Sequence, residues 1–229
     1  MRLKLYSNYI NSAGERVRIA LALKGMDYEY VSVNSIGWDV YEKINPQRLM
    51  PALDIGGQIV PQATAILEYL EETHPDPALL PADPVLRARV RGFSQHVVSE
   101  MHAIDVIRVR RFLHGELGLD AEQVGKWQLH WFHKGFTALE ALLTSREQAW
   151  PFCFGDSPAW ADLHLVPQVH KGISRFQIDM ADYPLIGGIY ERCYPMDAFA
   201  GARPEAMPDY PGELVQPDMA ASSSNQSGL

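Results

Sequence analysis

Cysteine is scarce in this chain, which has two, Cys153 and Cys193, among 229 residues. Two separate cysteines cannot form a disulfide framework, a four-cysteine zinc site or a Cys-x-x-Cys redox pair. No metal site is predicted elsewhere, because His130 and His133 lack a carboxylate or cysteine at ligand spacing. If this protein carries out sulfur chemistry, a ligand must supply the sulfur.

Long hydrophobic runs and excess positive charge are also missing. No segment approaches the roughly eighteen apolar residues of a membrane span, and the N-terminus turns polar at Ser7 and Asn8, so no signal-peptide stretch is predicted. The net charge of -8 argues against nucleic-acid binding, which relies on Lys and Arg. We therefore expect a cytoplasmic protein with neither a membrane nor a nucleic acid as partner.

Residues 2–75 alternate short β-like runs with helical spacing. Four strands and two helices are predicted, at residues 3–6, 28–33, 52–55 and 58–60 and at residues 16–23 and 66–72. An irregular stretch separates the second strand from the third. The order β-α-β then β-β-α predicts a mixed four-stranded sheet, with one parallel pair and an antiparallel hairpin around Gly56-Gly57.

The remainder of the chain, to about residue 200, has helical periodicity. After a proline-rich connector at residues 74–87, long helices are predicted over residues 84–115, 120–145, 160–173 and 185–199. A sheet of this size buries little core alone, so we expect the helical half to pack against it. The predicted division is a sheet domain at 1–80, a helical domain at 85–211 and a flexible tail at 212–229.

Five segments carry a family resemblance through their order and spacing. They are residues 11–21 (NSAGERVRIAL), 45–53 (NPQRLMPAL), 62–72 (QATAILEYLEE), 161–169 (ADLHLVPQV) and 175–179 (RFQID). The first resembles the Ser-Ser-Cys-x-x-Arg-Val-Arg-Ile-Ala-Leu signature of zeta-class glutathione transferases, which include the maleylacetoacetate and maleylpyruvate isomerases. The resemblance implies the cytosolic glutathione transferase fold: an α/β thioredoxin-like N-terminal domain (βαβ-ββα) followed by an all-α C-terminal domain. It also implies glutathione as cosubstrate, a small-molecule electrophile and a homodimer, with no metal.

The resemblance assigns the γ-glutamyl group and the cysteinyl backbone of glutathione to the sheet domain. The γ-glutamyl carboxylate is expected at a helix start formed by Gln62, Ala63 and Thr64, where free N–H groups attract anions. Ala63 replaces the family's usual serine, which removes one hydrogen bond worth about 1 kcal/mol. The cysteinyl backbone is expected to pair with Met50, whose polar groups a cis bond before Pro51 turns toward the ligand. Helix capping by Gln62 and Thr64 is the structural alternative.

The thiol of glutathione needs a donor, because lowering its pKa by about two units requires roughly 2.7 kcal/mol. Ser12 is the hydroxyl at the expected helix start, and Asn11 stands where relatives carry the serine usually credited with activation. A helix N-cap is the structural alternative for Ser12. His102 matches a histidine that lines the glutathione site in maleylpyruvate isomerases, with a surface or interface position as its alternative.

For the electrophile, Arg175 matches the family's substrate-side arginine and can hold a carboxylate bidentately. Ile10 occupies the place of a second family arginine, so one cation is lost there. Arg108, with Arg110 and Arg111, is a candidate substitute, although a charge run on a long helix usually forms a solvated face.

Three functions follow in order of preference. The first is a zeta-like transferase that activates the glutathione thiolate for addition to a small electrophilic carbon compound. The second is a glutathione-dependent cis-trans isomerase of maleylacetoacetate or maleylpyruvate. The third is a non-catalytic scaffold with the same fold, while a thiol-disulfide oxidoreductase is disfavoured because no cysteine begins the first helix.

Overall fold

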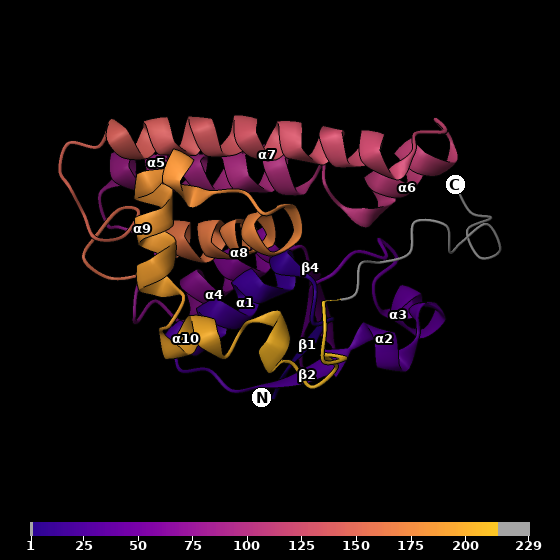
Figure 1. The fold of residues 1–229 in the computed structure, drawn as a ribbon. Coiled ribbons are helices and arrows are strands. Elements are labelled where there is room, and N and C mark those ends of the chain that lie inside the picture. Colours follow the sequence, from indigo (N-terminus) through magenta and orange to yellow (C-terminus); the bar gives the residue numbers. More distant parts are fainter. Residues whose placement is uncertain (1, 215–229) are drawn as a thin grey trace.

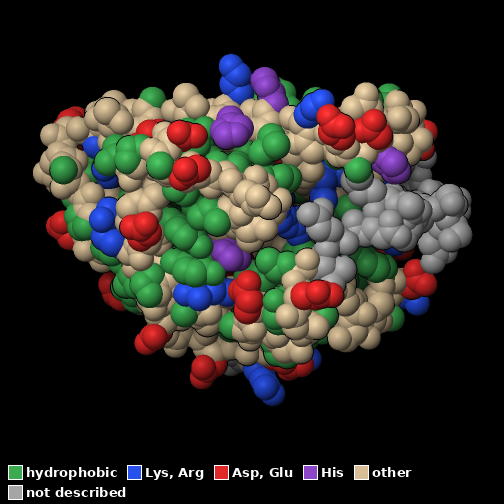
Figure 2. Space-filling model, in the orientation of Figure 1, with side chains coloured by type: hydrophobic (Ala, Val, Ile, Leu, Met, Phe, Trp, Pro, Cys, Tyr) green, Lys and Arg blue, Asp and Glu red, His purple; other side chains and the backbone are tan. Residues whose placement is uncertain are grey.

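The computed structural model describes residues 2–214 (Figure 1), so residues 215–229 of the predicted tail lie outside the described residues. Among the described residues, no helix is both long and apolar enough to cross a membrane. Acidic, basic and apolar side chains are interspersed on the face seen in Figure 2.

A mixed sheet is built from β1 (Leu3–Ser7), β2 (Tyr28–Ser32), β3 (Ala52–Ile55) and β4 (Gln58–Pro61), in the order β2-β1-β3-β4. Strand β1 runs parallel to β2 and antiparallel to β3, and β3 and β4 form a hairpin. The four predicted strands and their mixed topology are confirmed.

Helices α1 (Ser12–Leu23) and α4 (Ala63–Thr73) belong to this half. The predicted first helix began at Arg16, which was wrong by one turn, because Asn11 caps the helix earlier. The stretch predicted as irregular contains two short helices, α2 (Val33–Ile36) and α3 (Trp38–Ile44).

The second half is helical, as predicted. Its α-helices are α5 (Pro84–Gln95), α6 (Ile107–Gly115), α7 (Ala121–Thr144), α8 (Trp160–Phe176), α9 (Pro184–Cys193) and α10 (Asp197–Ala200). A π-helix, η1 (His96–His102), follows α5, and short 3-10 helices lie at η2 (Met180–Asp182) and η3 (Pro204–Ala206). The single helix predicted at 84–115 is wrong, because η1 and a break at 103–106 interrupt it. The helix predicted at 185–199 likewise divides into α9 and α10.

Helix α8 is the centre of the molecule, with α1 and α5 packed on it (Figure 1). One hydrophobic cluster runs through both halves: it joins Leu5 and Val17 of the sheet half to Phe93, Phe136 and Val166 of the helical half. The expectation that the helices complete the core of the small sheet is confirmed.

Glu71, near the end of α4, attaches the connector to the sheet half. Its carboxylate accepts a hydrogen bond from Lys24 Nζ at 2.8 Å and from the backbone N–H groups of Leu79 and Leu80. Lys24 Nζ also donates to two connector carbonyls, and both charged side chains are buried. The pair thus fixes the path of the chain between the two halves.

Replacement of Glu71 by glutamine is expected to lower the free energy of unfolding by about 3 kcal/mol, because the buried Lys24 ammonium loses its counter-charge. Denaturant unfolding measures this loss. Glu72→Gln makes the same change at an exposed neighbour and is expected to stay within about 0.5 kcal/mol of the original chain. Equal losses in the two variants would contradict the assignment.

Candidate active site

The first turn of α1 is capped by Asn11, whose side-chain oxygen accepts the N–H of Gly14. The amide nitrogen of Asn11 donates to the Met50 carbonyl at 3.5 Å, which ties this turn to the start of β3. Since Asn11 is the cap, Ser12 is the first helical residue, and the N-cap alternative for Ser12 is wrong. Its hydroxyl remains available at the positive end of the helix dipole.

Ser12 Oγ lies 3.1 Å from Nδ1 of His102, the last residue of η1, although 90 residues separate the two in sequence. Ser12 is 7% exposed and His102 is half-buried. Burial, followed by the positive charge of Arg16, lowers the pKa of His102 well below its ordinary value, so the imidazole is neutral near pH 7. When Nδ1 carries the proton, it donates to Oγ and leaves the Ser12 hydroxyl proton for a ligand.

The start of β3 and the start of α4 are neighbours. Strand pairing sets Ala52 opposite Pro61, so the Met50–Pro51 peptide and Gln62 lie at the same edge of the sheet. The peptide bond before Pro51 is cis, as predicted. Strand β1 pairs its Tyr6 with Ala52, which brings the β1–α1 turn to this edge as well.

The capping alternative for Gln62 is wrong. Gln62 precedes α4 with a φ of 72° and makes no side-chain cap. Its side-chain amide instead donates to Gln47 Oε1 at 2.7 Å. Ala63, 8% exposed, and Thr64 form the first turn, where backbone N–H groups of a helix start point outward.

A group of cations surrounds Asp105, in the break between η1 and α6. Lys171 Nζ pairs with Asp105, and Gln128 donates to the same carboxylate. Burial, followed by the charge of Arg110, lowers the pKa of Arg175, and burial lowers the pKa of Lys171 to about 8. Lys171 alone forms an ion pair with Asp105, while Arg110 and Arg175 interact with the same buried carboxylate electrostatically. The group therefore carries a net positive charge that an anion can balance.

The residues predicted to contact the electrophile agree only in part with the charged group around Asp105. Arg110 is buried, 5% exposed, so its interpretation as part of a solvated face is wrong. Arg108 is exposed, and its charge contributes to the lowered pKa of His102. Ile10 is half-buried and supplies no charge.

Sequence reasoning missed Lys171 and Asp105. A usable signal existed for Lys171, because it is the one lysine in α8 and follows the mainly apolar stretch 163–169. Asp105 had no such signal, since its burial depends on a break in a segment with continuous helical periodicity.

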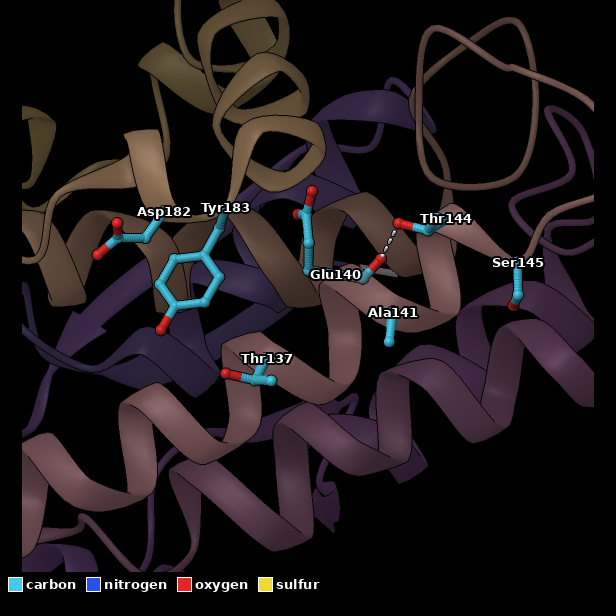
Figure 3. A pocket seen from close by; sticks show the side chains of 7 residues that line it. All are labelled: Thr137, Glu140, Ala141, Thr144, Ser145, Asp182 and Tyr183. Carbon is cyan, nitrogen blue, oxygen red and sulfur yellow. Dashed lines mark hydrogen bonds between the residues drawn. The ribbon is translucent and has the colours of Figure 1, made fainter.

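Two surface hollows lie away from these residues. The one in Figure 3, about 480 Å³, runs along α7 and the start of α9. Three of its polar side chains bond within the protein: Glu140 accepts two N–H groups of α9, Tyr183 bonds His133 at 2.8 Å, and Thr144 donates to the Glu140 carbonyl. No predicted site residue lines either hollow.

Comparisons with known proteins identify the family of this fold. Residues 5–78 match the model of the glutathione S-transferase N-terminal domain. The chain is 42% identical to a maleylpyruvate isomerase from Ralstonia sp over 90% of this chain and 99% of that protein. A holo structure of a maleylpyruvate isomerase, described as a bacterial zeta-class glutathione S-transferase, has a TM-score of 0.85, 42% identity and the same coverage of both chains. A maleylacetoacetate isomerase from Methylobacterium extorquens AM1, with bound malonate and glutathione, has a TM-score of 0.84 and 40% identity and covers 91% of this chain and 99% of its own.

The chain therefore belongs to the glutathione S-transferases and has the cytosolic fold of that family, as predicted. Within the family it belongs to the zeta class, together with the maleylpyruvate and maleylacetoacetate isomerases, and it is an enzyme.

Proposed function

We propose that this enzyme binds glutathione along the start of β3 and the first turn of α4, and that it stabilises the thiolate at the N-terminus of α1. The observation that carries the proposal is the Ser12–His102 contact beside a helix start that Asn11 already caps. A hydroxyl released from capping and held by a neutral imidazole is suited to donate to a thiolate.

The two ends of glutathione have separate partners in this proposal. The γ-glutamyl carboxylate meets the backbone N–H groups of Ala63 and Thr64, because the Gln62 side chain is bonded to Gln47 instead of closing the helix start. The cysteinyl backbone lies along Met50, whose carbonyl is linked to Asn11. This link joins the peptide-binding edge to the thiol-binding turn.

The proposed chemistry is addition of the thiolate to an electrophilic carbon. A carbon–sulfur bond forms as the electron pair of a conjugated double bond moves to the carbonyl oxygen. A transferase would protonate the adduct and release it. An isomerase would allow rotation about the new single bond, then re-form the double bond and expel the thiolate.

The isomerase alternative is favoured by the cations around Asp105. Maleyl-type substrates are dianions, and Arg175, Arg110 and Lys171 supply the charge that Ile10 does not. The most direct test adds cis-maleylpyruvate or maleylacetoacetate with about millimolar glutathione, a concentration in the usual range of enzyme KM values. Formation of the fumaryl product supports isomerisation, whereas a stable glutathione adduct of another electrophile supports transfer alone.

Ser12→Ala is expected to raise the pKa of the bound glutathione thiol toward its free value and to lower kcat/KM by about a hundredfold, because about 2.7 kcal/mol of thiolate stabilisation is at stake. Thiolate absorbance across pH gives the pKa, and steady-state rates give the activity. Ser12→Thr keeps a hydroxyl and is the matched variant. An unchanged thiol pKa in Ser12→Ala would show that Ser12 does not hydrogen-bond to the glutathione thiolate.

The affinity for a dicarboxylate electrophile is expected to depend on Lys171. Its ammonium is charged below a pKa of about 8 and loses that charge as the pH rises through this value. The KM is therefore expected to increase above that pH. Lys171→Arg keeps its positive charge to higher pH, so the increase in KM should begin at a higher pH. The same pH profile in both proteins would contradict this role.

We also propose that the enzyme is a homodimer, as the family resemblance implies. Sedimentation should then give about twice the 25.7 kDa of one chain, and a mass of one chain would contradict it.

A further inference from the structure

Asp209, in the last described segment, binds the sheet domain through three hydrogen bonds. Its carboxylate accepts the backbone N–H of Tyr9 at 3.3 Å and the hydroxyls of Tyr30 at 2.8 Å and Ser32 at 2.6 Å. The donor and acceptor positions are 177 to 200 residues apart in sequence. One side chain near the end of the chain thus gathers three donors from its beginning.

Two of the three donors, Tyr9 and Ser32, lie at the edge of the sheet that carries the candidate active site, and Tyr30 stands two residues before Ser32 in β2. Ser32 ends β2 and pairs in register with Ser7, which ends the neighbouring parallel strand β1. Tyr9 follows β1 in a turn that the Asn11 N–H closes on the Asn8 carbonyl at 3.3 Å. Asp209 therefore bridges the ends of two strands and holds the outer side of the turn that leads into α1.

The segment around Asp209 is attached at further points, and we call residues 202–210 the C-terminal strap. The ring of Tyr210 packs edge-on against Tyr9, with centroids 5.7 Å apart. At the other end of the strap, Arg18 of α1 donates to the Ala202 carbonyl at 2.9 Å. The strap thus contacts β2, the β1–α1 turn and α1 itself.

The contacts of Asp209 are largely sheltered from water. Tyr9 is 7% exposed and Ser32 is 9% exposed, while Asp209 is half-buried. Burial and the hydrogen bond to Asp209 raise the pKa of Tyr30, so its hydroxyl keeps the proton that it donates. Loss of the carboxylate would leave these donors without an acceptor at a site that water reaches poorly.

We propose that Asp209 is a positioning residue for the thiolate site: it fixes the Tyr9 turn, and through that turn the orientation of Asn11 and Ser12. This inference rests on the proposed function. Within the described residues, the hydrogen bonds of Asp209 reach neither β3 nor α4. Its loss should therefore disturb the thiol end of glutathione and spare the peptide end.

The test compares Asp209→Ala and Asp209→Asn with Glu213→Gln, which removes one negative charge at an exposed position just beyond the strap. The Kd for glutathione, the thiol pKa in the complex and kcat at saturating glutathione are measured for each. We expect Asp209→Ala to raise the thiol pKa and lower kcat about tenfold, the effect of one weakened hydrogen bond to a thiolate, with Kd nearly unchanged. Asp209→Asn keeps one acceptor oxygen, so its thiol pKa and kcat should lie between those of Asp209→Ala and the original chain. Glu213→Gln should have the same thiol pKa and kcat as the original chain.

A lower melting temperature with an unchanged thiol pKa and kcat would overturn the proposal, because Asp209 would then only stabilise the fold. So would a large loss of glutathione affinity without a change in thiol pKa. If Asp209→Ala fails to fold, Tyr30→Phe removes one donor from the same carboxylate and must shift the thiol pKa in the same direction. If the original chain does not bind glutathione, the proposed function is wrong. If the original chain binds glutathione and the Asp209 variants keep the low thiol pKa, only the role of Asp209 is wrong.

Discussion

The hydrogen bond from the Gly14 N–H to the Asn11 side chain is the interaction on which the candidate site depends. Because Asn11 caps α1, the hydroxyl of Ser12 is not used for capping and lies at the positive end of the helix. The same asparagine reaches Met50, so one residue connects the two edges that glutathione would contact. The substitution of asparagine for the family's serine is thus compatible with an intact site.

The surroundings of the site are built from buried charges that are only partly balanced. Asp105 accepts from Lys171 and Gln128, while Arg110 and Arg175 add positive charge nearby. Burying cations without equal counter-charge costs stability, and a bound anion would offset that cost. Burial, followed by the charges of Arg16 and Lys171, keeps His102 neutral, so Lys171 acts on the thiol side as well as on the electrophile side.

Local pattern predicted most of the fold. The Gly56-Gly57 turn and the β-branched and aromatic residues at 28–33 predicted strands that the structure contains, because both signals are local in the sequence. The helix predicted at 84–115 was wrong, since periodicity continues through the break where Asp105 turns inward to Gln128 of α7. Arg110 was misjudged for the same reason: it is buried on α6, which begins after the break and packs against α7.

The sequence by itself determined the succession of strands and helices, the helical second half and the family, because these depend on local spacing and on motifs that occur in order. Tertiary structure alone decided that Ser12 meets His102, that Lys171 meets Asp105 and that Asp209 reaches the Tyr9 turn. Each of these contacts joins segments far apart in the chain. Whether such side chains meet depends on the axial position and rotation of packed helices, which the sequence pattern of one element does not encode.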